Sequence, residues 1–168
     1  MHYAEIIEGY ADFVPEAVAL VHGETRRTWA EFEERAARLA AAFTAAGLHP
    51  GSKVGLLLYN GPGYYEGFLA GLKARMVPIN INYRYVDDEL VYLLGDSDAE
   101  ALIFHASLGD TVGRVAGRVS DLKLLVEVGD APRAVADAAP YEQLVTYPTA
   151  AAHSTPRPQP PAERRRPR

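Results

Sequence analysis

The sequence predicts an α/β fold, in which a partial, doubly wound and mainly parallel sheet follows a short hairpin near the N-terminus. Amphipathic helical patterns alternate with short continuous apolar runs, which is typical of βαβ units. The run Val54–Leu58 is apolar without alternation, as expected of a strand covered on both faces of a parallel sheet. With 168 residues, 48% of them hydrophobic and 23% charged, the chain is long enough for one globular domain.

The first 27 residues predict a helix and a hairpin. Apolar residues recur at three- to four-residue spacing over positions 6–13, and Pro15 ends this helix because proline cannot continue it. Residues 17–22 then predict a strand. The turn Gly23-Glu24 leads into a second strand over residues 25–27, since a two-residue turn containing glycine suits a hairpin.

The best-defined predicted element is the helix that follows Thr28. Thr28 and Glu31 have the spacing of a capping box, in which each side chain bonds the backbone N–H of the other residue. Apolar residues from Phe32 to Phe43 mark one face of this helix, and Gly47 ends it.

Helices and strands continue to alternate through the rest of the chain. After the strand at 54–58, a helix is expected to point five residues inward: Tyr64, Tyr65, Phe68, Leu69 and Leu72. Residues 76–81 predict the next strand, and Pro78 is tolerated near its start. The remaining predicted elements are a helix over 86–94, a strand over 101–104, a helix over 108–119 and a strand over 122–128.

The charge is unevenly distributed along the chain. Five arginines and one glutamate give residues 148–168 a charge of +4, so residues 1–147 carry −9 of the total of −5. An acidic body argues against a nucleic-acid partner, because phosphate binding needs clustered Lys and Arg on a folded face. Six of the twelve prolines also lie in residues 148–168, so we expect a folded domain over 1–147 and a disordered Pro/Arg-rich tail over 148–168.

Composition excludes several classes of protein and site. No apolar run approaches the roughly 18 residues of a membrane helix, and the acidic start differs from a signal peptide, so we expect a cytoplasmic protein without a membrane span. The absence of cysteine excludes disulfides, thiolate metal sites and a cysteine nucleophile. The five histidines show no metal-ligand spacing, so no metal site is expected.

Three motifs have both a chemical and a structural interpretation. The loop Gly61-Pro62-Gly63 opens a helix after a buried strand, but Gly67 falls one position late for a dinucleotide loop, so a plain helix start with Asn60 as its cap is favoured over a phosphate site. The acidic residues over 96–100 alternate like a calcium loop without its glycine, which favours a solvated turn. Ser107 lies near His105 in the sequence, but no nucleophile-elbow motif is present.

The candidate ligand-binding residues are those at the carboxyl ends of the predicted parallel strands, where ligands gather in open α/β sheets. They are Asn60, Asn82, Arg84 and His105. Arg84 is able to bind a phosphate or carboxylate, but a local ion pair with Asp87 or Asp88 is the favoured alternative. Tyr83 and Tyr85 either line an apolar pocket or cover the sheet edge. No residue is assigned as catalytic, cofactor-binding or metal-binding.

Several segments in order resemble the N-terminal region of adenylate-forming enzymes, the AMP-binding synthetase superfamily. They begin with Thr28–Phe32, Arg35–Ala40 and Gly47–Val54, and the agreement continues in register to Leu94. The segment from Lys73 to Tyr85 is similar to a bacterial acyl-CoA synthetase branch that acts on fatty or steroid-derived acids, although many members have Gly where Arg75 stands. The resemblance covers about residues 5 to 147.

The resemblance implies a two-step reaction for the intact family. A carboxylate attacks the α-phosphate of ATP in the presence of Mg²⁺ to give an acyl-adenylate, and the thiol of CoA then displaces AMP. The family's phosphate loop, its adenine and ribose contacts and its C-terminal catalytic lysine have no counterpart in this sequence. We therefore expect no cofactor to be bound and no catalysis by this chain alone.

The sequence leaves two functions open. The first is an N-terminal fragment of an ATP-dependent acyl-CoA synthetase; the likeness fades near Pro148, and the Pro/Arg composition beyond is what a shifted reading frame in GC-rich DNA produces. The alternative is a non-catalytic binding or regulatory module that pairs with a separately encoded catalytic part. In either case strands lack their later neighbours, so we expect self-association through an exposed sheet edge.

Overall fold

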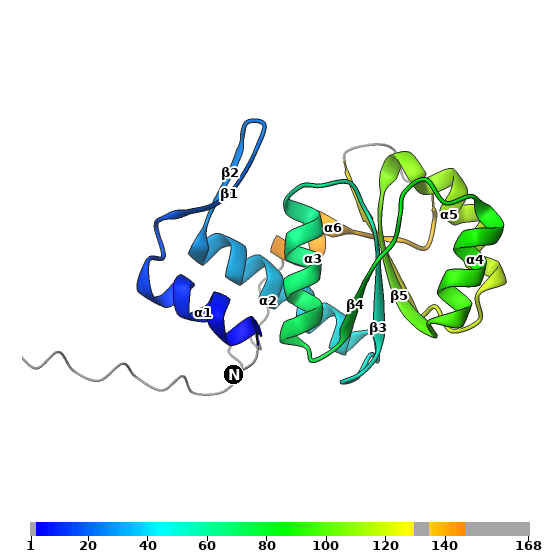
Figure 1. The fold of residues 1–168 in the computed structure, drawn as a ribbon, viewed down its shortest axis with the longest axis horizontal. Helices are drawn as coiled ribbons and strands as arrows, with labels where there is room; N and C mark the ends of the chain where they lie inside the picture. The colour runs from blue at the N-terminus through cyan, green and yellow to red at the C-terminus, as the bar shows by residue number, and fades with distance from the viewer. Residues whose placement is uncertain (1–2, 130–134, 147–168) are drawn as a thin grey trace, which may run out of the picture.

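The computed structural model describes residues 3–129 and 135–146, which include a five-stranded parallel sheet with helices packed on it (Figure 1). The strand order is β4-β3-β5-β6-β7. The strands are β3 (Lys53–Leu57), β4 (Val77–Asn80), β5 (Ala99–His105), β6 (Leu124–Val128) and β7 (Ala139–Pro140). Every neighbouring pair in this sheet is parallel, which confirms the predicted fold class.

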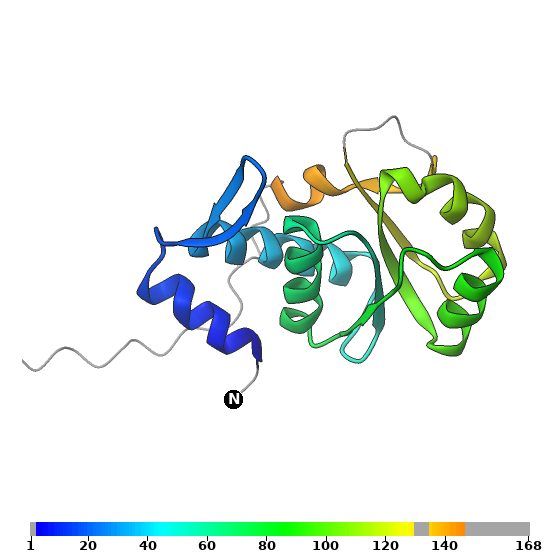
Figure 2. The same cartoon turned by 45° about the horizontal axis from the view of Figure 1, so that its top comes forward.

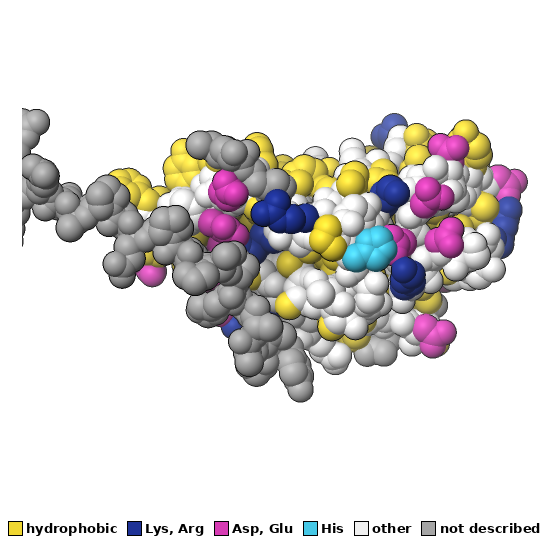
Figure 3. All heavy atoms as spheres, turned by 90° about the horizontal axis from the view of Figure 1, so that it is seen from below, with side chains coloured by type: hydrophobic (Ala, Val, Ile, Leu, Met, Phe, Trp, Pro, Cys, Tyr) yellow, Lys and Arg dark blue, Asp and Glu magenta, His cyan; other side chains and the backbone are white. Residues whose placement is uncertain are grey.

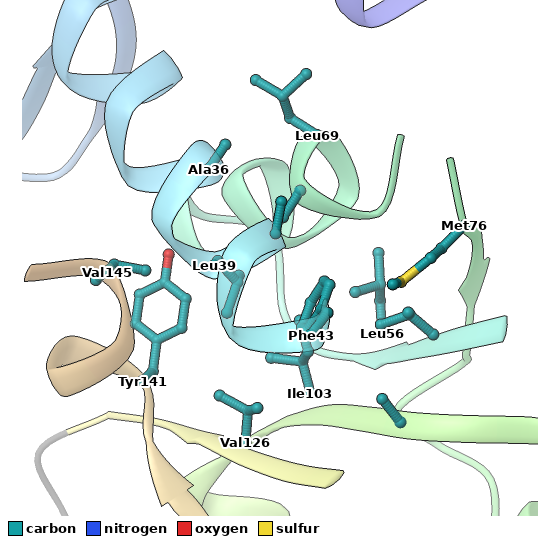
Figure 4. Close-up of a cluster of buried hydrophobic side chains, with 14 of the residues drawn as sticks. Ala36, Leu39, Phe43, Leu56, Leu69, Met76, Ile103, Val126, Tyr141 and Val145 are labelled. Atoms are coloured by element: carbon teal, nitrogen blue, oxygen red, sulfur yellow. The ribbon is translucent and has the colours of Figure 1, made fainter. Parts of the chain in front are cut away.

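Helices cover both faces of the sheet, as a doubly wound fold requires. One face packs against α2 (Trp29–Ala45), α3 (Pro62–Lys73) and α6 (Tyr141–Thr146), and the other packs against α4 (Asp87–Asp96) and α5 (Gly109–Val115). Adjacent residues of one strand point to opposite faces: Ile103 of β5 joins the first cluster (Figure 4), and Phe104 joins the second. This two-sided burial explains the apolar runs without alternation.

The N-terminal elements form a separate extension at one end of the sheet (Figure 2). Helix α1 (Tyr3–Phe13) is followed by the antiparallel hairpin of β1 (Val18–His22) and β2 (Thr25–Thr28). Both elements and the turn at Gly23, which has a φ of 56°, agree with the predicted helix and hairpin. Helix α2 then begins in the predicted capping box, because the side chains of Thr28 and Glu31 each accept the backbone N–H of the other residue.

Helix α3 differs from its prediction in the face that it buries. Tyr65 and Phe68 are 47% and 36% exposed, whereas Leu69 is buried, and so are Glu66 and Gly67. Glycine at position 67 lets α3 approach the sheet closely, since a Cβ there would lie 2.9 Å from the Cδ1 atom of Ile103. The helix therefore turns its glycines toward the sheet and leaves two aromatic rings outside.

The C-terminal part of the chain also departs from the prediction. The helix expected over 108–119 consists of α5 flanked by two 3₁₀ turns, Ala106–Leu108 and Ala116–Arg118. The short β7 and α6 were not predicted, because a two-residue strand and a six-residue helix carry too little periodicity. The tail expected over 148–168 lies outside the described residues.

One open edge of the sheet is formed by β4. The backbone N–H groups of Val77 and Ile81 donate to Ser52 and Leu56 at the β3 side, so the intervening position Pro78 faces away from β3. Proline has no N–H to offer a further strand, which weakens this edge as a template for pairing. Across the described residues, the helices include no span long and apolar enough to cross a membrane.

Candidate functional site

Aromatic and imidazole rings gather at the carboxyl ends of β3, β4 and β5. Tyr59 follows β3, and its ring centroid lies 4.8 Å from that of Tyr83, which follows β4. The same Tyr59 ring meets the ring of His105, the last residue of β5, at 5.0 Å in an edge contact. The parallel sheet thus brings together residues that are more than 20 positions apart in the sequence, at the edge where α/β folds bind ligands.

His105 also bonds Ser107, but the geometry is that of a helix cap. The Nδ1 atom of His105 accepts the backbone N–H of Ser107 at 3.2 Å and lies 2.9 Å from its hydroxyl oxygen. The pair caps the first 3₁₀ turn, which accounts for it without nucleophilic catalysis.

Arg84 lies beside this cluster, and among the described residues no carboxylate forms an ion pair with it. Its guanidinium lies 5.7 Å from the ring centroid of Tyr83. The side chain of Asn82 accepts the backbone N–H of Arg84 at 3.0 Å, which fixes the turn that carries both residues. The predicted local ion pair is wrong, because Asp87 and Asp88 pair with Arg114 and Arg118 of the neighbouring helical segment.

Asn60 does not join the aromatic cluster in the part of the chain that the structure describes. It is exposed, and its predicted role as a cap is also wrong: the N-cap of α3 is Gly61, without a side-chain cap bond. Pro62 occupies the first turn of α3, where a missing N–H costs nothing. The rings of Tyr83 and Tyr59 thus connect Arg84 with His105, and Asn82 bonds the backbone of Arg84. Asn60 follows Tyr59 directly in the chain and is exposed.

A buried polar network, which the sequence pattern did not predict, lies where α3 packs against α2 and α6. Glu66 is completely buried and accepts hydrogen bonds from the Tyr141 hydroxyl and from Arg35 Nε, the latter at 3.0 Å. Arg27 of β2 lies 3.6 Å from the second carboxylate oxygen. Arg35 also bonds both oxygens of Glu142, at 2.9 and 3.2 Å. The network joins β2, α2, α3 and α6.

Burial and hydrogen bonding oppose each other in this network. Burial raises the pKa of Glu66, while the hydrogen bond from Tyr141 and the charge of Arg35 counteract part of that rise. Burial and the nearby Glu66 carboxylate both raise the pKa of Tyr141. Burial disfavours the charge on Arg35, but its bonds to Glu142 and Glu66 outweigh this and raise its pKa. The network thus links four elements around the buried Glu66, and its solvent-exposed acid is Glu142, whose side chain is 63% exposed.

The described residues hold no group of three or more His, Asp and Glu side chains placed to bind a metal ion. Of the alternating acids predicted to form a solvated turn, Asp98 lies in a turn, whereas Glu100 lies in β5 and pairs with Lys123. On the face shown in Figure 3, basic and acidic side chains are interspersed with hydrophobic ones, and no continuous basic patch of the kind that binds nucleic acid is visible.

Curated relatives match the chain over most of its length but only over a small part of their own. The 3-oxocholest-4-en-26-oate–CoA ligase of Rhodococcus rhodochrous is 39% identical over 130 residues, which is 77% of this chain and 23% of the relative. The medium-chain acyl-CoA ligase Mig of Mycobacterium avium is 34% identical over 138 residues, which is 74% of this chain and 25% of that enzyme. In both cases the matched part is N-terminal.

Solved structures show the same arrangement of elements. A putative long-chain-fatty-acid CoA ligase from Rhodopseudomonas palustris superposes with a TM-score of 0.82 and 24% identity, covering 94% of this chain and 38% of that one. A benzoate CoA ligase from Burkholderia xenovorans superposes with a TM-score of 0.76 and 25% identity, covering 93% and 31%.

The sequence profile of the AMP-binding enzyme family matches residues 8–166, nearly the whole chain. This match agrees with the parallel sheet, with its two helical layers and with the resemblance stated above. The chain therefore belongs to the AMP-binding enzyme family, and it spans about a quarter of the length of the curated acyl-CoA ligases that it matches.

Proposed function

We propose that these 168 residues supply the N-terminal part of an acyl-CoA ligase and do not activate a carboxylate by themselves. The observation that carries the proposal is the asymmetry of coverage: 77% of this chain matches a steroid-acid CoA ligase, yet the match accounts for 23% of that enzyme. The function of this segment is then to build one sheet and its helical layers within a larger enzyme.

The chemistry of the reaction supports the proposal that this segment does not activate a carboxylate by itself. Attack of a carboxylate on the α-phosphate of ATP needs donors for the triphosphate, a metal ion to neutralise charge and a cation at the transferred group. The Pro-Lys-Gly end of this family's phosphate loop does not occur in the sequence, and the described residues contain no metal-ligand cluster. ATP, Mg²⁺ and CoA would thus be held by groups outside these residues.

The names of the relatives suggest which carboxylic acid the complete enzyme activates. The two curated proteins described above are named for a cholesterol-derived acid and for medium-chain acyl groups. We propose that the complete enzyme activates a fatty or steroid-derived acid of comparable size, and that this segment contributes to it structurally.

A thioester assay tests this function. The purified chain is incubated with ATP, Mg²⁺, CoA and either decanoate or 3-oxocholest-4-en-26-oate, alone and together with the part of the Rhodococcus rhodochrous ligase that follows its matched segment. We expect AMP and acyl-CoA only from the mixture. The intact relative is the positive control, and thioester formation by the chain alone would refute the proposal.

A further inference from the structure

An apolar groove lies between the N-terminal extension and the sheet domain. Its volume is about 370 Å³, and it is bordered by α1, the hairpin, α2 and α3. The lining includes Tyr3 and Ile7 of α1, Leu20 of β1, Trp29 of α2, and Tyr65 and Phe68 of α3. All of its lining residues are apolar or aromatic, so the groove offers few polar atoms to a hydrophilic ligand.

Several aromatic side chains at this groove are exposed to solvent, although burying their apolar rings would be favourable. Tyr65 and Phe68 are 47% and 36% exposed, and Tyr3 is 62% exposed. Tyr65 and Phe68 lie three positions apart on α3, so they share one face of that helix. A contiguous apolar surface of this kind marks an interaction site rather than ordinary solvent exposure.

The walls of the groove are held in place by contacts between its elements. Lys73 at the end of α3 forms ion pairs with Glu8 of α1 and Glu33 of α2, and its side chain is only 6% exposed. The rings of Tyr10 and Trp29 stack with their centroids 5.0 Å apart, which joins α1 to α2. The groove is therefore preformed, and a partner that enters it does not need to separate these helices.

Related structures extend beyond the fold described here. The fold described here makes up 38% of the Rhodopseudomonas palustris chain and 31% of the Burkholderia xenovorans chain, so each neighbour continues well beyond the matched elements. Protein that packs onto an apolar face must itself be apolar there.

We propose that this groove is the docking surface for the remainder of the acyl-CoA ligase fold, which inserts apolar side chains between α1 and α3. The inference rests on the proposed function, since it takes the partner to be the missing part of such a ligase. Docking buries Tyr65 and Phe68, and this explains why α3 carries aromatic residues on a face where the described residues leave them exposed.

Co-purification tests the docking directly. The full chain is co-expressed with the tagged part of the Rhodococcus rhodochrous ligase that follows its matched segment. We expect the unaltered chain to co-purify, and we expect Phe68→Glu and Tyr65→Ser each to reduce the amount retained at least about tenfold, because the partner then faces a charge or a lost ring. Tyr92→Glu is the matched control: Tyr92 is 71% exposed on α4, at the other face of the sheet, and the variant should be retained like the unaltered chain.

The outcomes separate folding, docking and function. The thermal midpoint of each variant is measured in the chain alone, where Tyr65→Ser is expected to stay close to the unaltered value. Retention of both groove variants, or failure of the unaltered chain to co-purify, would overturn the docking proposal. A discrete dimer of the chain alone that Phe68→Glu dissociates would assign the groove to a second copy and overturn it as well. A complex that forms through the groove but makes no thioester would refute the proposed function alone.

Discussion

Glu66 illustrates how a single residue sets the arrangement of four elements. A carboxylate with no solvent exposure is costly unless donors and cations surround it, and here Arg27, Arg35 and Tyr141 do so. Because the partners come from positions 27 to 141, the network forms only when the hairpin, α2, α3 and α6 have all assembled. It therefore favours one tertiary arrangement over looser packings.

Removing the Tyr141 hydroxyl is expected to destabilise the fold. Tyr141→Phe deletes a donor to a buried carboxylate, and the loss of such a bond costs about 1–3 kcal/mol. The free energy of unfolding in urea measures the effect. Tyr92→Phe, at an exposed ring, is the control and should change this free energy by less than about 0.5 kcal/mol. Equal stability of the two variants would show that the hydroxyl contributes nothing.

Gly55 of β3 is expected to tolerate no side chain. A Cβ there would lie 2.8 Å from Ile81 Cδ1 and 3.0 Å from Leu102 Cδ1, and both of these side chains are buried. Gly55→Ala should therefore cost about 1–3 kcal/mol through overpacking. Gly95→Ala in α4, where nothing lies within 4 Å, should instead raise stability by up to about 1 kcal/mol through helix propensity. Thermal unfolding measures both variants: the midpoint should fall in Gly55→Ala and rise in Gly95→Ala.

At the scale of single elements, α2 depends on its capping box. Thr28→Ala removes the acceptor for the Glu31 N–H and should lower the free energy of unfolding by about 1 kcal/mol. Thr28→Ser keeps the hydroxyl and should remain within a few tenths of the unaltered chain. If both variants lose the same stability, the cost comes from the Thr28 methyl group and not from the cap.

The pairing of α4 with α5 is expected to depend on pH. Arg114 donates to both carboxylate oxygens of Asp87, at 2.7 and 3.0 Å, and these bonds lower the pKa of Asp87 below its ordinary value of 3.8. A lowered pKa in the folded state adds stability above pH 3.8, and this stability is lost as the pH falls through the folded-state value. NMR titration of the Asp87 carboxyl should show a midpoint below 3.8 that rises in Arg114→Gln. An unchanged midpoint would contradict the assignment.

At the scale of the whole molecule, exposed apolar surface and open sheet edges raise the question of self-association. Pro78 in β4 and Pro140 in β7 place a residue without an N–H in both outer strands, which limits pairing through the backbone. The expected association through a sheet edge stays a prediction. We expect it to be weak, open-ended and dependent on concentration.

Sedimentation velocity over a range of concentrations measures this association. Val77→Lys charges the exposed side chain at the β4 edge and should reduce association more than Phe68→Glu does at the groove. A larger effect of Phe68→Glu would show that the groove, and not the edge, governs contacts between copies.

The order of elements and much of their extent follow from local sequence. The capping box of Thr28 and Glu31, the hairpin turn at Gly23 and the apolar runs of β3, β5 and β6 act through neighbours in the chain or through two-sided burial, so the pattern predicts them. That rings following β3, β4 and β5 meet was expected from the fold class, since a parallel sheet aligns the carboxyl ends of its strands.

Contacts between distant segments were decided by the tertiary structure. Glu66 stands among apolar residues of α3, a pattern that signals a buried charge only once Arg35 and Tyr141 are placed beside it. Likewise, Tyr65 and Phe68 have the spacing of a core face, but the glycines of α3 fit against β3 and β5 and turn those rings outward. The sequence by itself determined which elements form and in what order, because those depend on local periodicity. Only the fold decided which side of each helix is buried, because that depends on the shape of the surface it meets.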